Sequence, residues 1–196
     1  MAKKKNEREN QGRTFEGEYR TSKEELRAYR TARIHKKIRC LSFKKQKPSK
    51  EGHRIVFIPM HDEHDEKTSY QLVHMMSEKA LVAPGNLSIE EKVTIIGQSD
   101  LLIGMRLHSL IFSAIQTTPF IAISYDPKID AFAQIANQPN IGHVEKDNWD
   151  GQQLFDKAVD MLRDRNSIEQ ALRVQVSRLQ VEAWNTATMA LETFSK

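Results

Sequence analysis

Short apolar runs alternate with stretches of helical periodicity along the chain from residue 54 onward. Apolar runs typical of buried strands lie at residues 54–60, 80–85, 100–105, 119–126 and 140–146. Elsewhere apolar residues recur every three or four positions, which predicts helices at residues 65–78, 88–99, 106–116, 127–138, 150–164 and 167–195. This alternation predicts an α/β fold, in which right-handed crossovers build a parallel sheet flanked by helices.

Local signals support several of these helices. Ser88 and Glu91 have the spacing of a capping box, and Pro127 stands at a favoured first-turn position. The last predicted helix is long, and its apolar residues form one stripe made of Leu172, Val176, Leu179, Ala183, Ala187, Ala190 and Phe194. A stripe of this kind needs a surface to pack against.

The charge is divided unevenly between two parts of the chain. The net charge is +4, but residues 1–50 contain 17 of the 30 basic and 6 of the 26 acidic residues, a net of +11. The rest of the chain is acidic, with a net charge of −7. We therefore expect a basic, largely disordered arm and linker at 1–53, with a short helix near 23–38, and one folded domain at 54–195.

Composition narrows the class of protein. No apolar run approaches the ~20 residues of a membrane span, and no apolar segment of a secretory signal follows the charged start. Cys40 is the only cysteine, which excludes an intrachain disulfide. These features favour a cytoplasmic protein. Peripheral contact of the basic arm with an anionic membrane stays open, whereas nucleic acid is not an expected partner because the arm has few aromatic residues and no known motif.

The polar chemistry of the predicted domain gathers at three strand ends. Ligands of open α/β sheets bind beyond the carboxyl ends of the strands. The sequence places PMHDEHD after the first predicted strand, GMRLH after the third and SYDPK after the fourth. Because the carboxyl ends of parallel strands share one edge of a sheet, we expect the ligand site at that edge.

GMRLH combines a backbone and two side chains suited to an anion. Gly104 permits close approach of a ligand, and the helix that follows offers its first N–H groups. Arg106 presents a planar fork that matches phosphate or carboxylate, and His108 could exchange a proton because histidines titrate near neutral pH. Two structural alternatives stay open: Arg106 could pair with a structural carboxylate, and His108 could be a hydrogen-bonded core residue.

Lys128 and His61 complete the candidate site. Lys128 falls in the first turn of a predicted helix, where the helix dipole disfavours a cation unless an anion is bound. An ion pair with Asp126 or Asp130 is the alternative. His61 is the residue of HDEHDE closest to its strand end, and it is the one we expect to face a ligand. The run as a whole is typical of a solvated charged loop, so no metal site is predicted.

Three segments resemble the C-terminal half of bacterial polysaccharide pyruvyl transferases of the cell-wall-polymer type: VFIPMH at 56–61, SDLLIGMRLHSLIFS at 99–113 and PFIAISYDPKIDAF at 119–132. The similarity extends roughly over residues 54–195. GMRLH followed by ISYDPK at this separation is more specific than either motif alone. The resemblance implies a Rossmann-like domain, the C-terminal one of a glycosyltransferase-B-like fold, here with a long C-terminal helix.

The resemblance also implies a reaction. Such enzymes transfer the pyruvyl group of phosphoenolpyruvate to a sugar, commonly N-acetylmannosamine, as a cyclic ketal, and they release phosphate. On the matching positions Arg106 would hold the phosphate or carboxylate of the donor, His108 would be the general acid/base, and Lys128 would help to bind the donor. Gly104 and His61 complete the expected substrate-binding set. Phosphoenolpyruvate and a glycan acceptor are the implied partners, with no cofactor and no metal.

The chain departs from that family at its N-terminus. Family members carry an N-terminal Rossmann-like domain that supplies further cationic donor contacts and part of the acceptor surface, whereas residues 1–53 are too few and too polar to form it. We therefore expect a donor-binding half, which is either inactive alone or completed by a partner chain that supplies the other half. A nucleotide-sugar-dependent glycosyltransferase-like domain and a non-enzymatic anion-binding module stay open as alternatives.

Overall fold

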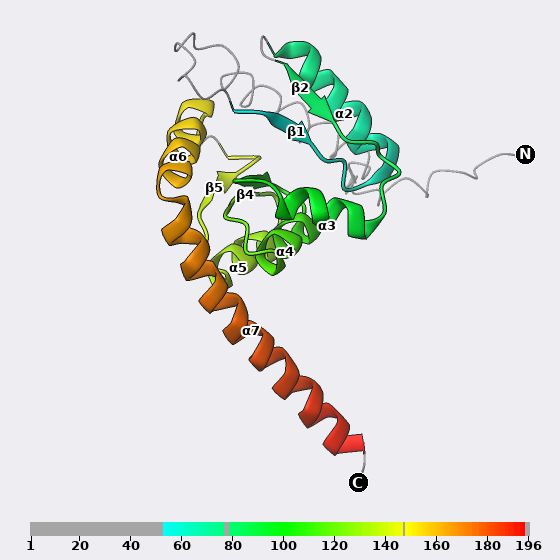
Figure 1. Ribbon diagram of the computed structural model, residues 1–196, viewed down its shortest axis with the longest axis vertical. Helices are drawn as coiled ribbons and strands as arrows, with labels where there is room; N and C mark the ends of the chain where they lie inside the picture. The colour runs from blue at the N-terminus through cyan, green and yellow to red at the C-terminus, as the bar shows by residue number, and fades with distance from the viewer. Residues whose placement is uncertain (1–52, 77–78, 147, 195–196) are drawn as a thin grey trace, which may run out of the picture.

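The computed structural model describes residues 53–76, 79–146 and 148–194, which fold into parallel strands alternating with helices (Figure 1). In chain order the elements are β1 (Ile55–Phe57), α2 (Asp62–Met75), β2 (Ala80–Val82), α3 (Ile89–Gly97), β3 (Leu102–Gly104), α4 (Leu107–Ile115), β4 (Phe120–Ser124), α5 (Pro127–Ile135), β5 (Asn140–His143), α6 (Gly151–Arg163) and α7 (Arg165–Phe194).

The predicted α/β fold with a long C-terminal helix is confirmed. Each strand and helix expected between residues 54 and 195 is present in the predicted order, although the strands are shorter than the apolar runs that indicated them. The predicted arm and linker of residues 1–53, with the helix expected near 23–38, lie outside the described residues except for His53.

Side-chain caps fix the starts of α3 and α5, which local signals in the sequence predicted. Ser88 Oγ accepts a hydrogen bond from the Glu91 N–H (3.2 Å), and Glu91 Oε2 accepts one from the Ser88 N–H (2.7 Å). At α5, Asp126 Oδ1 accepts a hydrogen bond from the Lys128 N–H (3.0 Å), and Pro127 occupies the first turn. These caps satisfy N–H groups that have no partner inside the helix. The second cap also sets the position of Lys128 at the start of α5.

Among the described residues the strands form two small parallel sheets rather than the single sheet that we expected. β1 pairs with β2, and β4 lies between β3 and β5. Leu102 lies opposite Phe120 and Gly104 opposite Ala122, so β3 and β4 run to the same edge of their sheet. The apolar runs correctly indicate which residues are extended, but which strands pair depends on contacts between distant segments.

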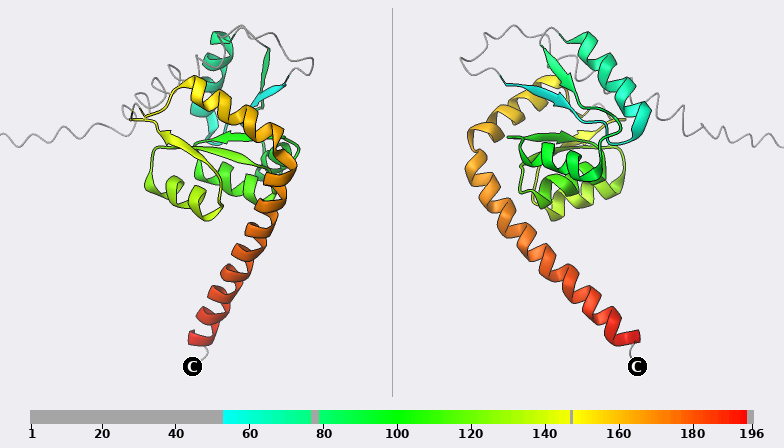
Figure 2. Two further views of the ribbon diagram at one scale, coloured as in Figure 1. Left: turned by 90° about the vertical axis from the view of Figure 1, so that its left-hand side faces the viewer. Right: turned by 45° about the vertical axis from the view of Figure 1, so that its right-hand side comes forward.

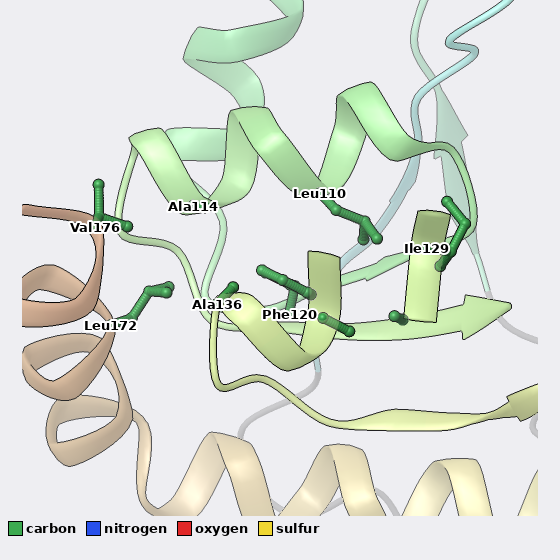
Figure 3. Packing of buried hydrophobic residues seen from close by; sticks show 9 residues of the cluster. Leu110, Ala114, Phe120, Ile129, Ala136, Leu172 and Val176 are labelled. Atoms are coloured by element: carbon green, nitrogen blue, oxygen red, sulfur yellow. The ribbon is translucent and has the colours of Figure 1, made fainter. Parts of the chain in front are cut away.

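β4 is the centre of the larger sheet. All five of its residues are buried. Because side chains alternate along a strand, Phe120 and Ala122 pack into one apolar cluster while Ile121 and Ile123 pack into a second. The first cluster lies between the sheet and helices α4 and α5 (Figure 3), and the second includes residues of α6.

Helix α7 begins against this core and then leaves it. Leu172 and Val176 are buried in the cluster around Phe120 (Figure 3). From residue 180 to residue 194 every side chain is exposed, and the helix extends away from the rest of the fold (Figures 1 and 2). The predicted apolar stripe is therefore buried only at its first two positions. Among the described residues no helix, α7 included, is both long enough and apolar enough to cross a membrane.

Leu172→Ala is expected to lower the free energy of unfolding by about 2 kcal/mol, at the low end of the range for buried leucines because the site lies at the margin of the core. Leu172 is 1% exposed, whereas Leu191 on the same helix is 69% exposed. Leu191→Ala is the matched control and should change the free energy by less than about 0.5 kcal/mol. Urea unfolding followed by circular dichroism measures both, and equal losses would contradict the packing described here.

Candidate active site at the carboxyl ends of the strands

Three helices begin at the strand ends where the sequence predicted a ligand site. His61 is the N-cap of α2 after β1, Arg106 is the N-cap of α4 after β3, and Asp126 is the N-cap of α5 after β4. Because β3 and β4 are paired and parallel, the starts of α4 and α5 lie at the same edge of the larger sheet. The Arg106 side chain makes no capping hydrogen bond to α4, which leaves its guanidinium available for other partners.

Arg106 forms an ion pair with Asp65 of α2. Its Nη2 lies 2.6 Å from Asp65 Oδ1 and its Nε lies 3.3 Å from Asp65 Oδ2, which gives the two-point geometry of an arginine on a carboxylate. The two side chains are 32% and 22% exposed, so solvent reaches both. In this ligand-free arrangement Arg106 therefore pairs with a carboxylate, which is the structural alternative that the sequence left open.

The environment of Arg106 keeps its charge fixed. Burial, the largest single influence, lowers the pKa of its guanidinium, but the hydrogen bond and the negative charge of Asp65 together with Tyr125 outweigh it. The pKa of Arg106 is therefore raised above its usual value. A cation that is permanently charged and partly desolvated is suited to holding an anion.

Asp65 also connects Arg106 to the start of α2. Its Oδ2 accepts a hydrogen bond from the backbone N–H of His61 (2.9 Å), so one carboxylate joins the strand end after β1 to the strand end after β3. Asp65 was not among the predicted site residues, because the HDEHDE run is typical of a solvated loop. The run instead forms the first turn and a half of α2, and its place beyond a strand end is the signal that could have identified Asp65.

His108 lies in the first turn of α4, two residues after Arg106, and it is exposed. The centre of its ring is 6.3 Å from the ring centre of Phe112, at a tilt of 47°. The alternative of a buried core histidine is therefore wrong. The imidazole is therefore exposed at the start of a helix, two residues after Arg106, where solvent reaches it.

Lys128 has a partner in the first turn of α5. Its Nζ lies 3.4 Å from Asp126 Oδ2, and the lysine side chain is 53% exposed. Of the two carboxylates that the sequence offered as partners, the structure selects Asp126. Exposed ion pairs of this kind contribute little stability, so an incoming anion would compete for Lys128 at small cost.

Gly104 is needed for the packing of α4 on β3. A Cβ atom at Gly104 would lie 2.8 Å from Ser109 Oγ and 2.9 Å from Leu110 Cδ2. Ser109 is held in place because its hydroxyl donates to the Arg106 carbonyl (2.7 Å), and Leu110 is fully buried. A role of Gly104 in ligand approach stays a prediction, while its packing role fixes the start of the helix that carries Arg106 and His108.

Gly104→Ala is expected to destabilise the fold by about 1–3 kcal/mol, because the new methyl group overpacks a well-filled junction. Gly97→Ala provides the control. There the new Cβ would meet only the end of the Gln116 side chain, which is exposed, and alanine favours the helix by up to about 1 kcal/mol. Thermal unfolding should therefore shift in opposite directions for the two variants, and a neutral Gly104→Ala would contradict the packing role.

The rings of His61 and His64 are 6.5 Å apart, centre to centre. Within the described ranges, no group of three or more histidine, cysteine or acidic side chains is arranged to hold a metal ion.

Comparison with known proteins gives one match. A family model described as polysaccharide pyruvyl transferase matches residues 23–127, more than half of the chain. No curated protein and no solved structure matches it. The matched range includes His61, Asp65, Arg106 and His108 and ends one residue before Lys128. It begins about thirty residues before residue 54, where the resemblance in the sequence begins. The chain thus belongs to the polysaccharide pyruvyl transferase family.

Proposed function

We propose that the protein is the donor-binding part of a polysaccharide pyruvyl transferase and that it binds phosphoenolpyruvate at the start of α4. The observation that carries the proposal is the half-buried guanidinium of Arg106, held at this helix start within the family match. The donor has a phosphate and a carboxylate, and both fit the planar fork of an arginine. A helix N-terminus adds partial positive charge at the same point.

Binding requires that the donor displaces a carboxylate. In the ligand-free arrangement Arg106 is paired with Asp65 and Lys128 with Asp126, so these four side chains carry no net charge. The anionic groups of the donor replace Asp65 at Arg106 and Asp126 at Lys128. The donor also accepts hydrogen bonds from the N–H groups of α4. We infer that further cationic contacts and the acceptor surface come from the second Rossmann-like half that the family resemblance implies.

His108 is positioned for the proton transfers of ketal formation. As an acid it donates a proton to the methylene carbon of phosphoenolpyruvate, which places positive charge on the neighbouring carbon. One sugar hydroxyl then bonds to that carbon and gives its proton to His108, which became neutral in the first step. A second hydroxyl of the same sugar replaces the phosphate, which leaves with its bonding electron pair and takes up the proton of that hydroxyl. Arg106 and Lys128 stabilise the charge on the departing phosphate. We place this reaction in the cytoplasm, where the proposed donor is made.

Thermal unfolding of the full chain with candidate donors tests the proposal. Phosphoenolpyruvate is expected to raise the unfolding temperature in a concentration-dependent way, because a ligand that binds the folded state stabilises it. Pyruvate, which lacks the phosphate, and a nucleoside diphosphate serve as comparisons. Stabilisation by the nucleoside diphosphate alone would favour a nucleotide-sugar enzyme, and stabilisation by none of the three would overturn the donor site.

A further inference from the structure

A histidine that the proposed reaction does not use stands at another strand end of the larger sheet. His143 is the last residue of β5, which runs parallel to β4 on the side away from β3. The carboxyl ends of these three strands therefore share the edge at which α4 and α5 begin. Because ligands of open α/β sheets bind beyond such ends, His143 stands at the same edge as Arg106 and Lys128.

An irregularity in the pairing of β4 with β5 decides which way His143 faces. Asn140 lies opposite Ala122, whereas Ser124, two residues further along β4, lies opposite His143 rather than Gly142. One extra residue in β5 is a β-bulge, and Gly142 has a φ of +139°, which residues with a Cβ rarely adopt. In a regular ladder His143 would point to the other face of the sheet. Bulges are frequent beside active sites because they redirect a side chain in this way.

The bulge places His143 on the face of the sheet that α5 covers. Asn140 stands on this face, because its side-chain amide donates a hydrogen bond to Asp130 of α5. Ser124 shares the face of Phe120, which packs against residues of α4 and α5. Residues opposite one another on neighbouring strands point to the same face, so His143 lies on the side of α5, near the start of that helix.

The register also sets the separation of His143 from Arg106. Gly104 lies opposite Ala122, and the backbone is still extended two residues later, at Arg106. Arg106 therefore comes level with Ser124, which lies opposite His143. With about 4.8 Å between neighbouring strands, the Cα atoms of Arg106 and His143 are about 10 Å apart. An arginine and a histidine at this separation can contact the two ends of one small ligand.

The fold uses one ring nitrogen of His143 and leaves the other to a ligand. Nδ1 accepts a hydrogen bond from the Glu145 N–H (3.1 Å), so this nitrogen carries no proton and the proton of the neutral ring is on Nε2. Nε2 makes no hydrogen bond to another residue in the described part of the chain, and the residue is only partly buried. The indole N–H of Trp149 donates to the His143 carbonyl (3.1 Å), which holds the backbone in place. His143 thus presents a fixed N–H donor.

We propose that His143 is a further donor-binding residue, whose Nε2–H donates a hydrogen bond to one anionic group of phosphoenolpyruvate. The inference rests on the proposed function. Arg106, beside β3, holds the other anionic group, so the donor lies across the end of β4. Lys128 at the start of α5 contributes its charge on the side of His143. Arg106 and Lys128 must each leave a carboxylate to bind the donor, whereas Nε2 of His143 leaves no partner among the described residues.

Two substitutions separate this role from a structural one, because each keeps the function of one ring nitrogen. His143→Gln places an amide N–H near the position of Nε2 but loses the acceptor for the Glu145 N–H. His143→Asn keeps an acceptor near the position of Nδ1 but loses the outer donor. Isothermal titration calorimetry of the full chain with phosphoenolpyruvate should show a loss of affinity of about tenfold for His143→Asn and of less than about threefold for His143→Gln.

The opposite order, or equal losses in the two variants, would overturn the inference, because asparagine is the better replacement for a histidine that only holds the Glu145 N–H. Arg106→Ala in the same series separates this failure from a failure of the proposed function. If the unmodified protein binds phosphoenolpyruvate and only Arg106→Ala weakens binding, the donor site stands without His143. If the unmodified protein does not bind it, both proposals fall.

Nuclear magnetic resonance of the imidazole nitrogens gives a second readout. In the ligand-free protein the neutral ring of His143 should carry its proton on Nε2. His74 is the matched control and should carry it on Nδ1, because that nitrogen lies 2.8 Å from the Tyr70 carbonyl oxygen. Saturating phosphoenolpyruvate should shift the Nε2 signal of His143 and leave His74, in the last turn of α2, unchanged. An unchanged His143 signal at saturation would overturn the inference.

Discussion

Arg106→Ala is expected to lower the affinity of the protein for phosphoenolpyruvate by at least about 100-fold, equivalent to about 2.8 kcal/mol. The substitution removes a permanently charged fork, and charge-assisted hydrogen bonds contribute about 1.5–3 kcal/mol each. Isothermal titration calorimetry measures the change directly. The domain should stay folded, because a partly exposed ion pair such as that of Arg106 with Asp65 contributes about 1 kcal/mol or less to stability.

Two further variants separate a ligand role of Arg106 from a purely structural one. Arg106→Lys keeps the charge but loses the planar fork, so we expect an intermediate loss of affinity of about tenfold. Asp65→Asn removes the competing negative charge while leaving an amide oxygen for the His61 N–H, and it should bind the donor at least as tightly as the unmodified protein. If Asp65→Asn and Arg106→Ala weaken donor binding equally, Arg106 acts only as a structural partner of Asp65.

Much of the fold follows from local signals in the sequence. The Ser88 and Glu91 pair predicts the start of α3 because a capping box needs only residues three positions apart. Pro127 marks the start of α5 for a similar reason. The run FIAIS predicts a buried strand, and β4 is buried at every position. Each of these predictions depends on residues close together in the chain.

Pairings between distant segments could not be predicted in this way. Asp65 lies 41 positions before Arg106, and nothing in the spacing of either residue identifies the other as its partner. The division into two sheets has the same origin. The apolar character of Ile55, Val56 and Ile103 predicts burial, yet their exposed fractions in the structure are 42%, 41% and 40%.

The candidate site shows the same contrast. Arg106, His108 and Lys128 were predicted from the rule that ligands bind at the carboxyl ends of parallel strands. All three residues lie at helix starts beyond such ends. Their partners were predictable only where they were local. Asp126, two residues before Lys128, was among the carboxylates expected to pair with it. Whether these side chains bind a donor remains the prediction that the Arg106 variants test.

Phe120→Ala is expected to lower the free energy of unfolding by about 3–5 kcal/mol, enough to unfold a marginally stable domain. Phe120 is fully buried in β4, and its ring stacks on that of Phe132 with centres 6.1 Å apart. It lies among residues from α4, α5 and α7 (Figure 3), so its removal leaves a cavity that several elements would have to close. Guanidinium unfolding followed by fluorescence and circular dichroism measures the loss.

Phe194→Ala is the matched control for Phe120→Ala, because Phe194 near the end of α7 is 90% exposed. It should change the free energy of unfolding by less than about 0.5 kcal/mol. The pair also bears on the site, since β4 supports both α4, which carries Arg106 and His108, and α5, which carries Lys128. A loss below about 1 kcal/mol for Phe120→Ala would mean that the two helices are held by something other than this cluster, because deleting a buried aromatic ring from a close-packed core costs more than that.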